Sequence, residues 1–364
     1  MLAPETAASL TSDINGGCIM IKRSTFLAGA LVLAAAAPAA AGSAYTGIYS
    51  FGDSLSDAGN VFIATGGLVS APGYQPAPPY SLGRFSNGPV WTQILSAGLG
   101  LGALTPTLAG GTDFAWGGAT TGYGLTLDPG APVPTLLQQV QQFSLSVGGK
   151  ASPNALYTFS IGANDLFSIL ESPLDLGTPA GLAQALTLAA GAAQAEADAA
   201  LTLRAEGARR LVVFDAPDLG KTPGVLLAGG SAAATALSAY YNQQLFLDLL
   251  PVEAAGLTVI DLNTFKLIDK AVADPAAYGF TDVTDACYGG PYTGGGSACV
   301  NPDKYLFWDQ LHPTFAAQLI IGQEAAALAL AVPEPSTWAM MLTGFAALGF
   351  AGWRRRRESA AAQV

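Results

Sequence analysis

The sequence predicts an α/β domain with a mainly parallel sheet covered by helices on both faces. Short apolar runs of strand length alternate along the chain with longer helix-like stretches, and each candidate chemical motif follows directly after one of these runs. Strands that alternate with helices are typical of a parallel sheet with two buried faces. Ligands bind such sheets at the carboxyl ends of the strands, so the motifs also indicate where the site lies.

The expected elements can be placed along the chain in order. Five apolar runs are predicted as strands, at residues 46–51, 112–116, 155–161, 210–215 and 257–262, of which the second is the weakest. Helices are expected at about 88–98, 134–146, 179–206, 231–255 and 314–330. The 179–206 stretch consists almost entirely of Ala, Leu, Gln and Glu, which are strong helix formers.

Two further stretches, 66–83 and 287–303, are rich in Gly, Pro and Tyr and are expected to form loops over the site. Six aromatic residues in or near these loops are candidates for lining an acyl or sugar site, although tyrosines in such loops also serve simply to pack the loop. They are Tyr74, Tyr80, Phe85, Trp116, Tyr288 and Tyr292.

The N-terminal region predicts export. A short basic region at 20–23 precedes an apolar stretch at 25–37 and small residues at 38–44. This order is typical of a secretory signal peptide, here residues 20–44, with cleavage expected after Ala41 or Ala44. Residues 1–19 show no useful pattern and are interpreted as an upstream leader or a mis-assigned start.

The C-terminal region predicts a membrane segment. Pro333-Glu334-Pro335 is followed by an uncharged stretch, 338–353, and then by four arginines at 354–357. An apolar span closed by a basic cluster is typical of a transmembrane helix with its basic end in the cytoplasm. The order of these parts in 332–357 resembles the PEP-CTERM sorting signal of Gram-negative bacteria. That resemblance implies cleavage by an exosortase and delivery to the cell surface or extracellular matrix, and it leaves 358–364 as a tail.

Between these ends, residues 45–331 are expected to form one hydrolase-sized domain. Without the two terminal regions the chain keeps nine basic and 22 acidic residues, a charge of about −13. Such a charge disfavours nucleic acid and anionic membrane surfaces as partners. It does not identify a substrate.

The two cysteines of this domain, Cys287 and Cys299, bracket a glycine-rich segment. In an exported protein they are most simply a disulfide, which would contribute roughly 3 kcal/mol by the loop-entropy relation. With two thiols and one histidine available, no metal site is expected.

The single histidine of the chain, His312, is the candidate general base, because imidazole exchanges a proton near neutral pH. Asp309, three residues earlier, can fix its tautomer, and Ser54, after the first predicted strand, can act as the nucleophile. Alternatively, the histidine is structural and Ser54 caps a helix that begins near Asp57.

Two further positions are candidates for stabilising a negative oxygen. Gly118 can bring its backbone N–H close to a substrate because it lacks a side chain, and Asn164 can offer its amide. A tight turn and an Asx-turn are the structural alternatives.

These motifs together resemble the GDSL, or SGNH, esterases and lipases. The matching blocks are 52–60, 113–119, 162–165 and 309–314, and segments 83–91 and 215–223 resemble further parts of the lipase-like branch. The resemblance implies a three-layer α/β/α sandwich of flavodoxin-like type with a five-stranded sheet, and ester hydrolysis without metal or cofactor.

The resemblance also carries roles onto matching positions: Ser54 as nucleophile, Asp309 and His312 as its partners, and Ser54 N–H, Gly118 and Asn164 as the oxyanion hole. Two departures stand out, because Asp113 and Asp215 replace the more usual asparagines. Gly117 remains an alternative oxyanion donor.

The sequence therefore predicts an exported serine ester hydrolase. Lipid acyl esters, short acyl esters and acylated polysaccharide are all compatible substrates, and signal peptidase and exosortase are the expected processing partners. The alternative is a non-catalytic surface or matrix protein that uses the same fold to bind polysaccharide.

Overall fold

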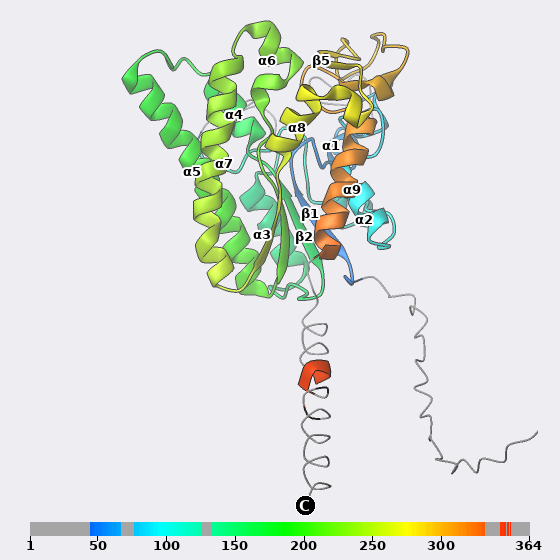
Figure 1. Ribbon diagram of the computed structural model, residues 1–364, viewed down its shortest axis with the longest axis vertical. Helices are drawn as coiled ribbons and strands as arrows, with labels where there is room; N and C mark the ends of the chain where they lie inside the picture. The colour runs from blue at the N-terminus through cyan, green and yellow to red at the C-terminus, as the bar shows by residue number, and fades with distance from the viewer. Residues whose placement is uncertain are drawn as a thin grey trace, which may run out of the picture. The chain divides into compact units, whose positions relative to one another are not determined.

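The computed structural model describes residues 44–66, 76–124, 133–331, 343–346, 348 and 350. Its central sheet has four parallel strands in the order β1-β2-β3-β4 (Figure 1). They are β1 (Ile48–Gly52), β2 (Leu156–Ser160), β3 (Arg210–Phe214) and β4 (Thr258–Leu262). The registers pair Gly52 with Ser160 and Phe214 with Leu262, so the carboxyl ends of the strands lie along one edge of the sheet.

The predicted strand at 112–116 is not a regular strand, so the expectation of five strands was wrong. This segment lies beside β1, where Phe114 N–H donates to Ser50 O (2.7 Å), but it forms only isolated bridges from Asp113 to Ser50 and to Pro106. The Asp113 carboxylate accepts hydrogen bonds from the backbone N–H groups of Ala58 (2.7 Å) and Ala115 (3.1 Å). A side chain that takes backbone donors in this way competes with ladder pairing.

The helices confirm the five helical stretches expected from the sequence and add four short ones. Their bounds are α1 (Asn60–Ala64), α2 (Trp91–Gly98), α3 (Leu136–Ser146), α4 (Ala163–Leu170), α5 (Pro179–Glu206), α6 (Pro223–Ala228), α7 (Ser231–Ala254), α8 (Thr264–Ala273) and α9 (Phe315–Ala331). The long helix α5 begins as its sequence indicates, because Thr178 caps it by accepting from Gly181 N–H (3.2 Å) and Pro179 follows the cap.

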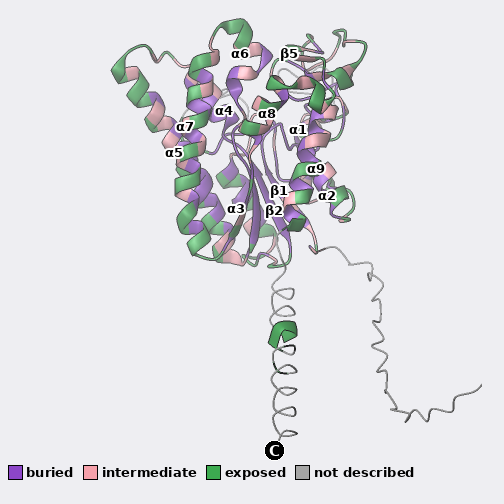
Figure 2. Ribbon diagram, viewed as in Figure 1, coloured by how far each residue is buried: buried purple, intermediate pink, exposed green. Residues whose placement is uncertain are grey.

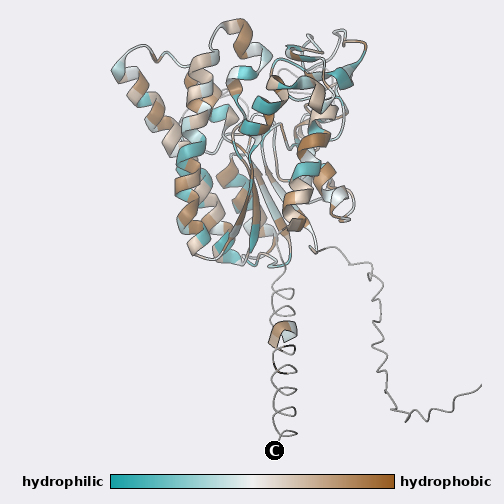
Figure 3. Cartoon of the chain, in the orientation of Figure 1, coloured by the Kyte–Doolittle hydropathy of each residue, from teal (hydrophilic) through white to brown (hydrophobic). Residues whose placement is uncertain are grey.

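The helices cover both faces of the sheet and make a three-layer α/β/α sandwich (Figure 1). Alternate strand residues point to opposite faces, so Phe159 and Val213 pack toward α3, α5 and α7, whereas Val212 and Phe214 pack toward α2 and α9. The sheet is buried throughout its centre and exposure is confined mainly to outer helix faces (Figure 2). Along α5 and α7, both hydrophobic and hydrophilic stretches occur (Figure 3), and several leucines on these helices are exposed.

A small second sheet pairs β5 (Asp282–Ala286) with β6 (Tyr305–Phe307) in parallel. The loop between these strands contains a disulfide that joins Cys287 to Cys299, with their Cα atoms 4.9 Å apart. Residues 287–299 are called the disulfide loop below. β6 leads directly to Trp308 and Asp309, so this small sheet positions the segment that carries Asp309 and His312.

The two terminal regions fall mostly outside the described residues. The predicted signal peptide, 20–44, lies there except for Ala44, and so does most of the predicted membrane helix, 338–353. Within the described part of the chain, no helix has both the length and the apolar character needed to cross a membrane.

Candidate active site

The turn after β1 carries Ser54. Gly52 ends the strand with φ 148°, and a Cβ there would clash with the carbonyl oxygen of Ser160, which instead accepts from Asp53 N–H (3.0 Å). Ser56 and Asp57 then donate their backbone N–H groups to Asp53 O at 3.1 and 3.0 Å. The following helix begins at Asn60, later than expected, so Ser54 stands in a tight turn and does not cap a helix.

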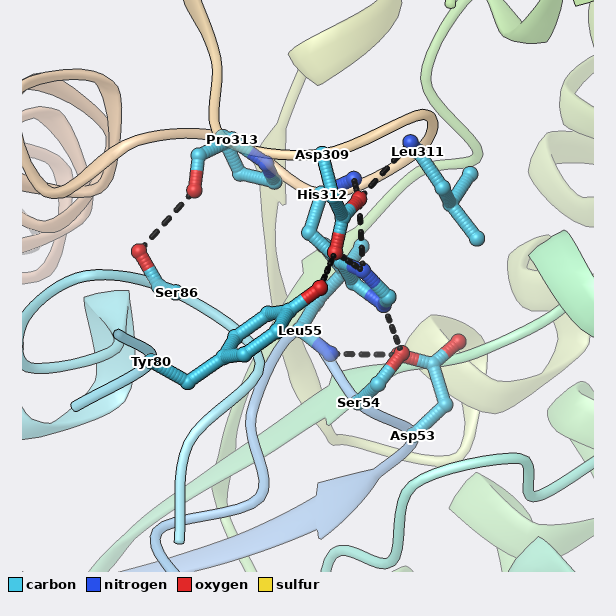
Figure 4. A network of polar contacts seen from close by, with 9 residues as sticks. All are labelled: Asp53, Ser54, Leu55, Tyr80, Ser86, Asp309, Leu311, His312 and Pro313. Atoms are coloured by element: carbon cyan, nitrogen blue, oxygen red, sulfur yellow. Dashed lines mark hydrogen bonds and ion pairs between the residues drawn. The ribbon is translucent and has the colours of Figure 1, made fainter. Parts of the chain in front are cut away.

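Ser54, His312 and Asp309 form one hydrogen-bonded row (Figure 4). His312 Nε2 lies 2.7 Å from Ser54 Oγ, and Nδ1 lies 2.8 Å from Asp309 Oδ2. All three side chains are buried, yet Ser54 keeps 7% of its surface exposed. The fold therefore brings together the three residues that the sequence singled out, although Ser54 and His312 are 258 positions apart. Their order is the one that base-assisted attack by a hydroxyl requires.

The Asp309 carboxylate is held by donors other than the imidazole. Oδ1 accepts from the backbone N–H groups of Leu311 (2.8 Å) and His312 (2.7 Å), and Oδ2 accepts from Tyr80 OH (2.7 Å). Burial alone would raise the pKa of Asp309, but the charge of His312 and these hydrogen bonds outweigh it and lower the pKa below its usual range. Asp309 is therefore ionised at neutral pH.

The loop of Gly117 and Gly118 distinguishes the two candidate oxyanion donors. Gly117 N–H donates to Asp57 Oδ2 (3.0 Å), and a Cβ at Gly117 would clash with the ring of Phe85. Gly118 has φ 82°, and its N–H, like that of Ser54, donates to no acceptor among the described residues. Gly118 is thus the glycine whose N–H is available to a ligand.

Asn164 lies at the start of α4, directly after β2. Its Nδ2 donates to Ala119 O (2.8 Å), which leaves the second N–H of the amide for a ligand. The next residue, Asp165, accepts from Thr121 N–H (3.0 Å) and Thr121 Oγ1 (2.7 Å). These bonds join the start of α4 to the 117–121 loop, so the positions of Asn164 and Gly118 are mechanically linked.

A cleft of about 700 Å³ opens beside this row, and Ser54, Gly118, Asn164 and His312 all line it. Its remaining walls are largely apolar and include Phe85, Val133, Phe167, Leu170, Leu176, Val225, Ala228 and Tyr292. Glu171 is the one charged side chain among its described lining residues apart from the histidine. A second pocket, also next to Ser54, holds only about 30 Å³, which is room for a water molecule or two and not for a substrate.

Comparison with known proteins identifies the family of the chain. The model of the GDSL-like lipase/acylhydrolase family matches residues 48–325. The chain belongs to this family. As a GDSL-type protein it is an ester hydrolase, and the resemblance inferred from its motifs is confirmed.

Three relatives show how far the similarity extends. The chain is 31% identical over 322 residues to an uncharacterized protein from the trpE-trpG intergenic region of Pseudomonas putida, covering 82% of this chain and 51% of that one. It is 28% identical to a phosphatidylcholine-sterol acyltransferase of Aeromonas hydrophila (78% and 90% covered) and 30% identical to the esterase EstA of Pseudomonas aeruginosa (79% and 47% covered). The chain spans about half the length of the two Pseudomonas proteins.

The C-terminal sorting signal is also confirmed, because residues 331–357 match the PEP-CTERM protein-sorting motif. This motif is associated with export and surface sorting in Gram-negative bacteria.

Several buried carboxyl groups surround the Ser54 turn of this GDSL hydrolase, and the sequence did not predict them as a group. Burial raises the pKa of Asp53 to about 7, of Asp57 to about 6 and of Asp165 to about 7. Burial likewise raises the pKa of Asp113 well above its usual value. Asp113 and Asp215 replace the more usual asparagines, and both accept hydrogen bonds from backbone N–H groups. Asp215 accepts from the N–H groups of Thr264 (2.6 Å) and Phe265 (3.1 Å).

The aromatic candidates divide into two groups. Phe85 and Tyr292 line the cleft, whereas Tyr80, Tyr288 and Trp116 do not: the two tyrosines are buried, and Trp116 packs against the main core. Tyr74 lies outside the described residues. The bond of Tyr80 to Asp309 was missed, because a tyrosine 229 positions away in a proline-rich loop carries no sequence signal for such a contact.

Proposed function

We propose that this GDSL domain hydrolyses carboxylic esters through an acyl-enzyme on Ser54. The observation that carries the proposal is the 2.7 Å contact of His312 Nε2 with Ser54 Oγ, continued by Nδ1 to an ionised Asp309. In the first step Ser54 Oγ attacks the ester carbonyl while His312 takes the hydroxyl proton. His312 then returns that proton to the leaving alcohol. Water, deprotonated by the same imidazole, releases the acid and restores Ser54.

Three donors support a negative oxygen in these steps: the backbone N–H groups of Ser54 and Gly118 and the side-chain amide of Asn164. Each lies at the cleft and has an N–H without an acceptor among the described residues. Donors of this kind contribute about 3 kcal/mol each to lowering the barrier. Asp309 stays ionised and fixes the imidazole with its Nδ1 protonated, so that Nε2 can accept.

The cleft supports a neutral ester with an apolar acyl group as the substrate. Its volume lies within the usual range of ligand sites, and its walls offer apolar side chains from α4 and α6. Acetylated polysaccharide would leave much of this apolar surface without a partner. The name of the Aeromonas relative, a phosphatidylcholine-sterol acyltransferase, supports a substrate with an acyl group.

The decisive experiment compares Ser54→Ala with wild type on a chromogenic acyl ester. The variant should lose at least about 1,000-fold in kcat while keeping the wild-type melting temperature. Ser146→Ala is the matched control, because Ser146 is an exposed serine at the end of α3 that donates only to Phe143 O. Turnover by Ser54→Ala at the wild-type rate would refute the proposal and favour the non-catalytic alternative.

The substrate class is tested with a series of esters from acetyl to dodecanoyl. Hydrolysis should improve with chain length, and Leu170→Gln should lower kcat/KM about tenfold for long chains while sparing acetyl esters, since burial of a leucine side chain is lost. Leu145→Gln, on an exposed leucine outside the cleft, is the control. A preference for acetyl esters that neither variant alters would exclude an acyl-binding role for the cleft.

We also propose that the hydrolase is exported by the predicted signal peptide and sorted to the surface through residues 331–357. The sorting motif supports this. Replacement of Pro333 and Pro335 by alanine should leave the protein in the inner-membrane fraction. Equal surface delivery of this variant would contradict the proposal.

A further inference from the structure

Tyr80 shares an oxygen of Asp309 with the imidazole. Its OH donates to Asp309 Oδ2 at 2.7 Å, and the same oxygen lies 2.8 Å from His312 Nδ1 (Figure 4). Tyr80 is only 3% exposed, and Asp309 is 4% exposed, so water cannot easily replace the phenol. If a buried carboxylate loses one donor, an oxygen lone pair is left without a partner and without water, which raises the free energy of the folded protein.

We propose that Tyr80 is a positioning residue for ester hydrolysis, which keeps Asp309 aimed at His312, and that the disulfide loop holds Tyr80 in place. This inference rests on the proposed function of Ser54, His312 and Asp309. Tyr80 itself touches neither the cleft nor the reacting atoms, and it acts through Asp309.

The electrostatic setting fits this role. Burial and the negative charge of Asp309 raise the pKa of Tyr80 well above its usual value, so the phenol keeps its proton and always donates. The hydrogen bond from Tyr80 in turn helps to keep the pKa of Asp309 low. The titratable groups that face this pair are His312 on the Asp309 side and Tyr288 and Tyr292 on the Tyr80 side, and Asp53 faces His312 from the β1 turn.

The disulfide loop packs its two tyrosines against Tyr80. The ring of Tyr288 meets Tyr80 edge-on at 5.3 Å between centroids, and the ring of Tyr292 lies at 5.7 Å. Tyr292 also contacts the His312 ring at 5.9 Å, and its backbone carbonyl accepts from Ala77 N–H (2.9 Å), three residues before Tyr80. The loop therefore touches both side chains that bond Asp309.

The backbone of the disulfide loop continues into the segment that carries Asp309 and His312. Cys299 N–H donates to Cys287 O (2.7 Å), Tyr288 N–H donates to Trp308 O (2.6 Å), and Trp308 N–H donates to His312 O (2.7 Å). The rings of Tyr288 and Trp308 stack at 5.5 Å. Closure of the loop by the disulfide thus fixes one wall of the Tyr80 pocket and the main chain beside Asp309 together.

The first test is Tyr80→Phe, which keeps every ring contact and removes only the OH. We expect kcat to fall about tenfold or more with KM nearly unchanged, because a hydrogen bond to an ionised group is lost. The acid limb of the kcat profile should also move to higher pH, since Asp309 loses a donor that keeps its pKa low. The control is Tyr157→Phe, whose OH donates to Ser152 O away from the site. An unchanged kcat and acid limb for Tyr80→Phe would overturn the inference.

The second test measures the coupling to the disulfide loop. We expect the double replacement of Cys287 and Cys299 by alanine to lower kcat, and to lower it less when Tyr80→Phe is already present. Fully additive losses would show that the loop does not act through Tyr80. If Ser54→Ala retains activity, the proposed function fails; if Ser54→Ala is inactive but Tyr80→Phe matches wild type, only this inference fails.

A measurement on the wild-type protein needs no variant to fold. Because His312 is the single histidine of the chain, its Nδ1 proton gives one assignable downfield resonance in proton NMR. Reduction of the Cys287–Cys299 disulfide should shift this resonance as Tyr80 loosens. A resonance that stays in place after complete reduction would contradict the proposed coupling.

Discussion

The two halves of the candidate active site are supported in different ways. Ser54 follows β1 of the four-stranded sheet, and its turn is tied to β2, to the 117–121 loop and to buried carboxyl groups by hydrogen bonds from backbone N–H groups. His312 and Asp309 follow β6 of the small sheet and rest on a separate cluster of Tyr80, Cys287, Tyr288 and Trp308. One half depends on the core of the domain, and the other half depends on aromatic rings and a disulfide.

This difference indicates that the half with Ser54 should unfold only with the whole domain, whereas the half with His312 and Asp309, called the base half after its proposed role, can loosen locally. Local openings generally involve segments with few buried contacts. The two halves also differ in electrostatics, because the carboxyls around Ser54 have raised pKa values and Asp309 has a lowered one. Perturbing each half separately tests the distinction.

The largest effect is expected at Gly52. Gly52→Ala would place a Cβ against the carbonyl oxygen of Ser160, in a backbone conformation that alanine rarely adopts. A loss of about 3 kcal/mol in the free energy of unfolding is expected, measured by urea denaturation. Gly47→Ala, where the added Cβ meets nothing within 4 Å, is the control. Equal stability of the two variants would show that the β1 turn is not supported as described.

Loss of the disulfide should separate activity from global stability. With Cys287 and Cys299 reduced, activity should disappear at a lower urea concentration than the far-ultraviolet circular dichroism signal, because the base half opens first. In the oxidised protein the two transitions should lie closer together. Coincident transitions after reduction would contradict local opening.

A smaller effect is expected where two of the proposed oxyanion donors, Gly118 and Asn164, are linked. Thr121→Val removes the hydroxyl that donates to Asp165 Oδ1 at 2.7 Å but keeps the backbone bond. We expect kcat to fall by about threefold to tenfold, because Gly118 and Asn164 are then less firmly held. Thr187→Val, on an exposed threonine of α5, serves as the control. Wild-type kcat in Thr121→Val would mean that the link has no role.

The smallest expected effect is a dependence of the melting temperature on pH. A carboxyl with a raised folded-state pKa stabilises the fold fully below its unfolded pKa, and this contribution is lost as pH rises through the folded value. Burial raises the pKa of Glu196 to about 8 and of Asp53 to about 7, so the melting temperature should fall between pH 5 and pH 8. Asp309, with a lowered pKa, contributes stability that is lost only in stronger acid.

Glu196→Gln should reduce the change in the free energy of unfolding between pH 5 and pH 8 by at least about 1 kcal/mol. Glu253→Gln, on an exposed glutamate of α7, should leave it unchanged. A melting temperature that rises from pH 5 to pH 8 would show that these buried carboxyls are ionised in the folded protein.

The sequence predicted the fold class and the row of Ser54, His312 and Asp309, because each lies in a motif directly after a strand. The sequence could not show that the segment around Asp113 is not a regular strand. Apolar periodicity does not reveal that the Asp113 carboxyl group accepts a hydrogen bond from a nearby backbone N–H group. The short helices α4 and α6 were missed because one or two turns give no periodic signal, and α1 begins three residues later than the Asp57 start that the sequence indicated. The choice of Gly118 over Gly117 depended on Asp57, whose bond to Gly117 N–H spans 60 residues.

The proposed mechanism requires Ser54 to carry the acyl group. Mass spectrometry of the protein quenched during turnover of a slowly hydrolysed ester, with peptide mapping of the adduct, detects this group. We expect one acyl group on the peptide that contains Ser54, absent after Ser54→Ala. An active enzyme with its acyl group on another residue would contradict it.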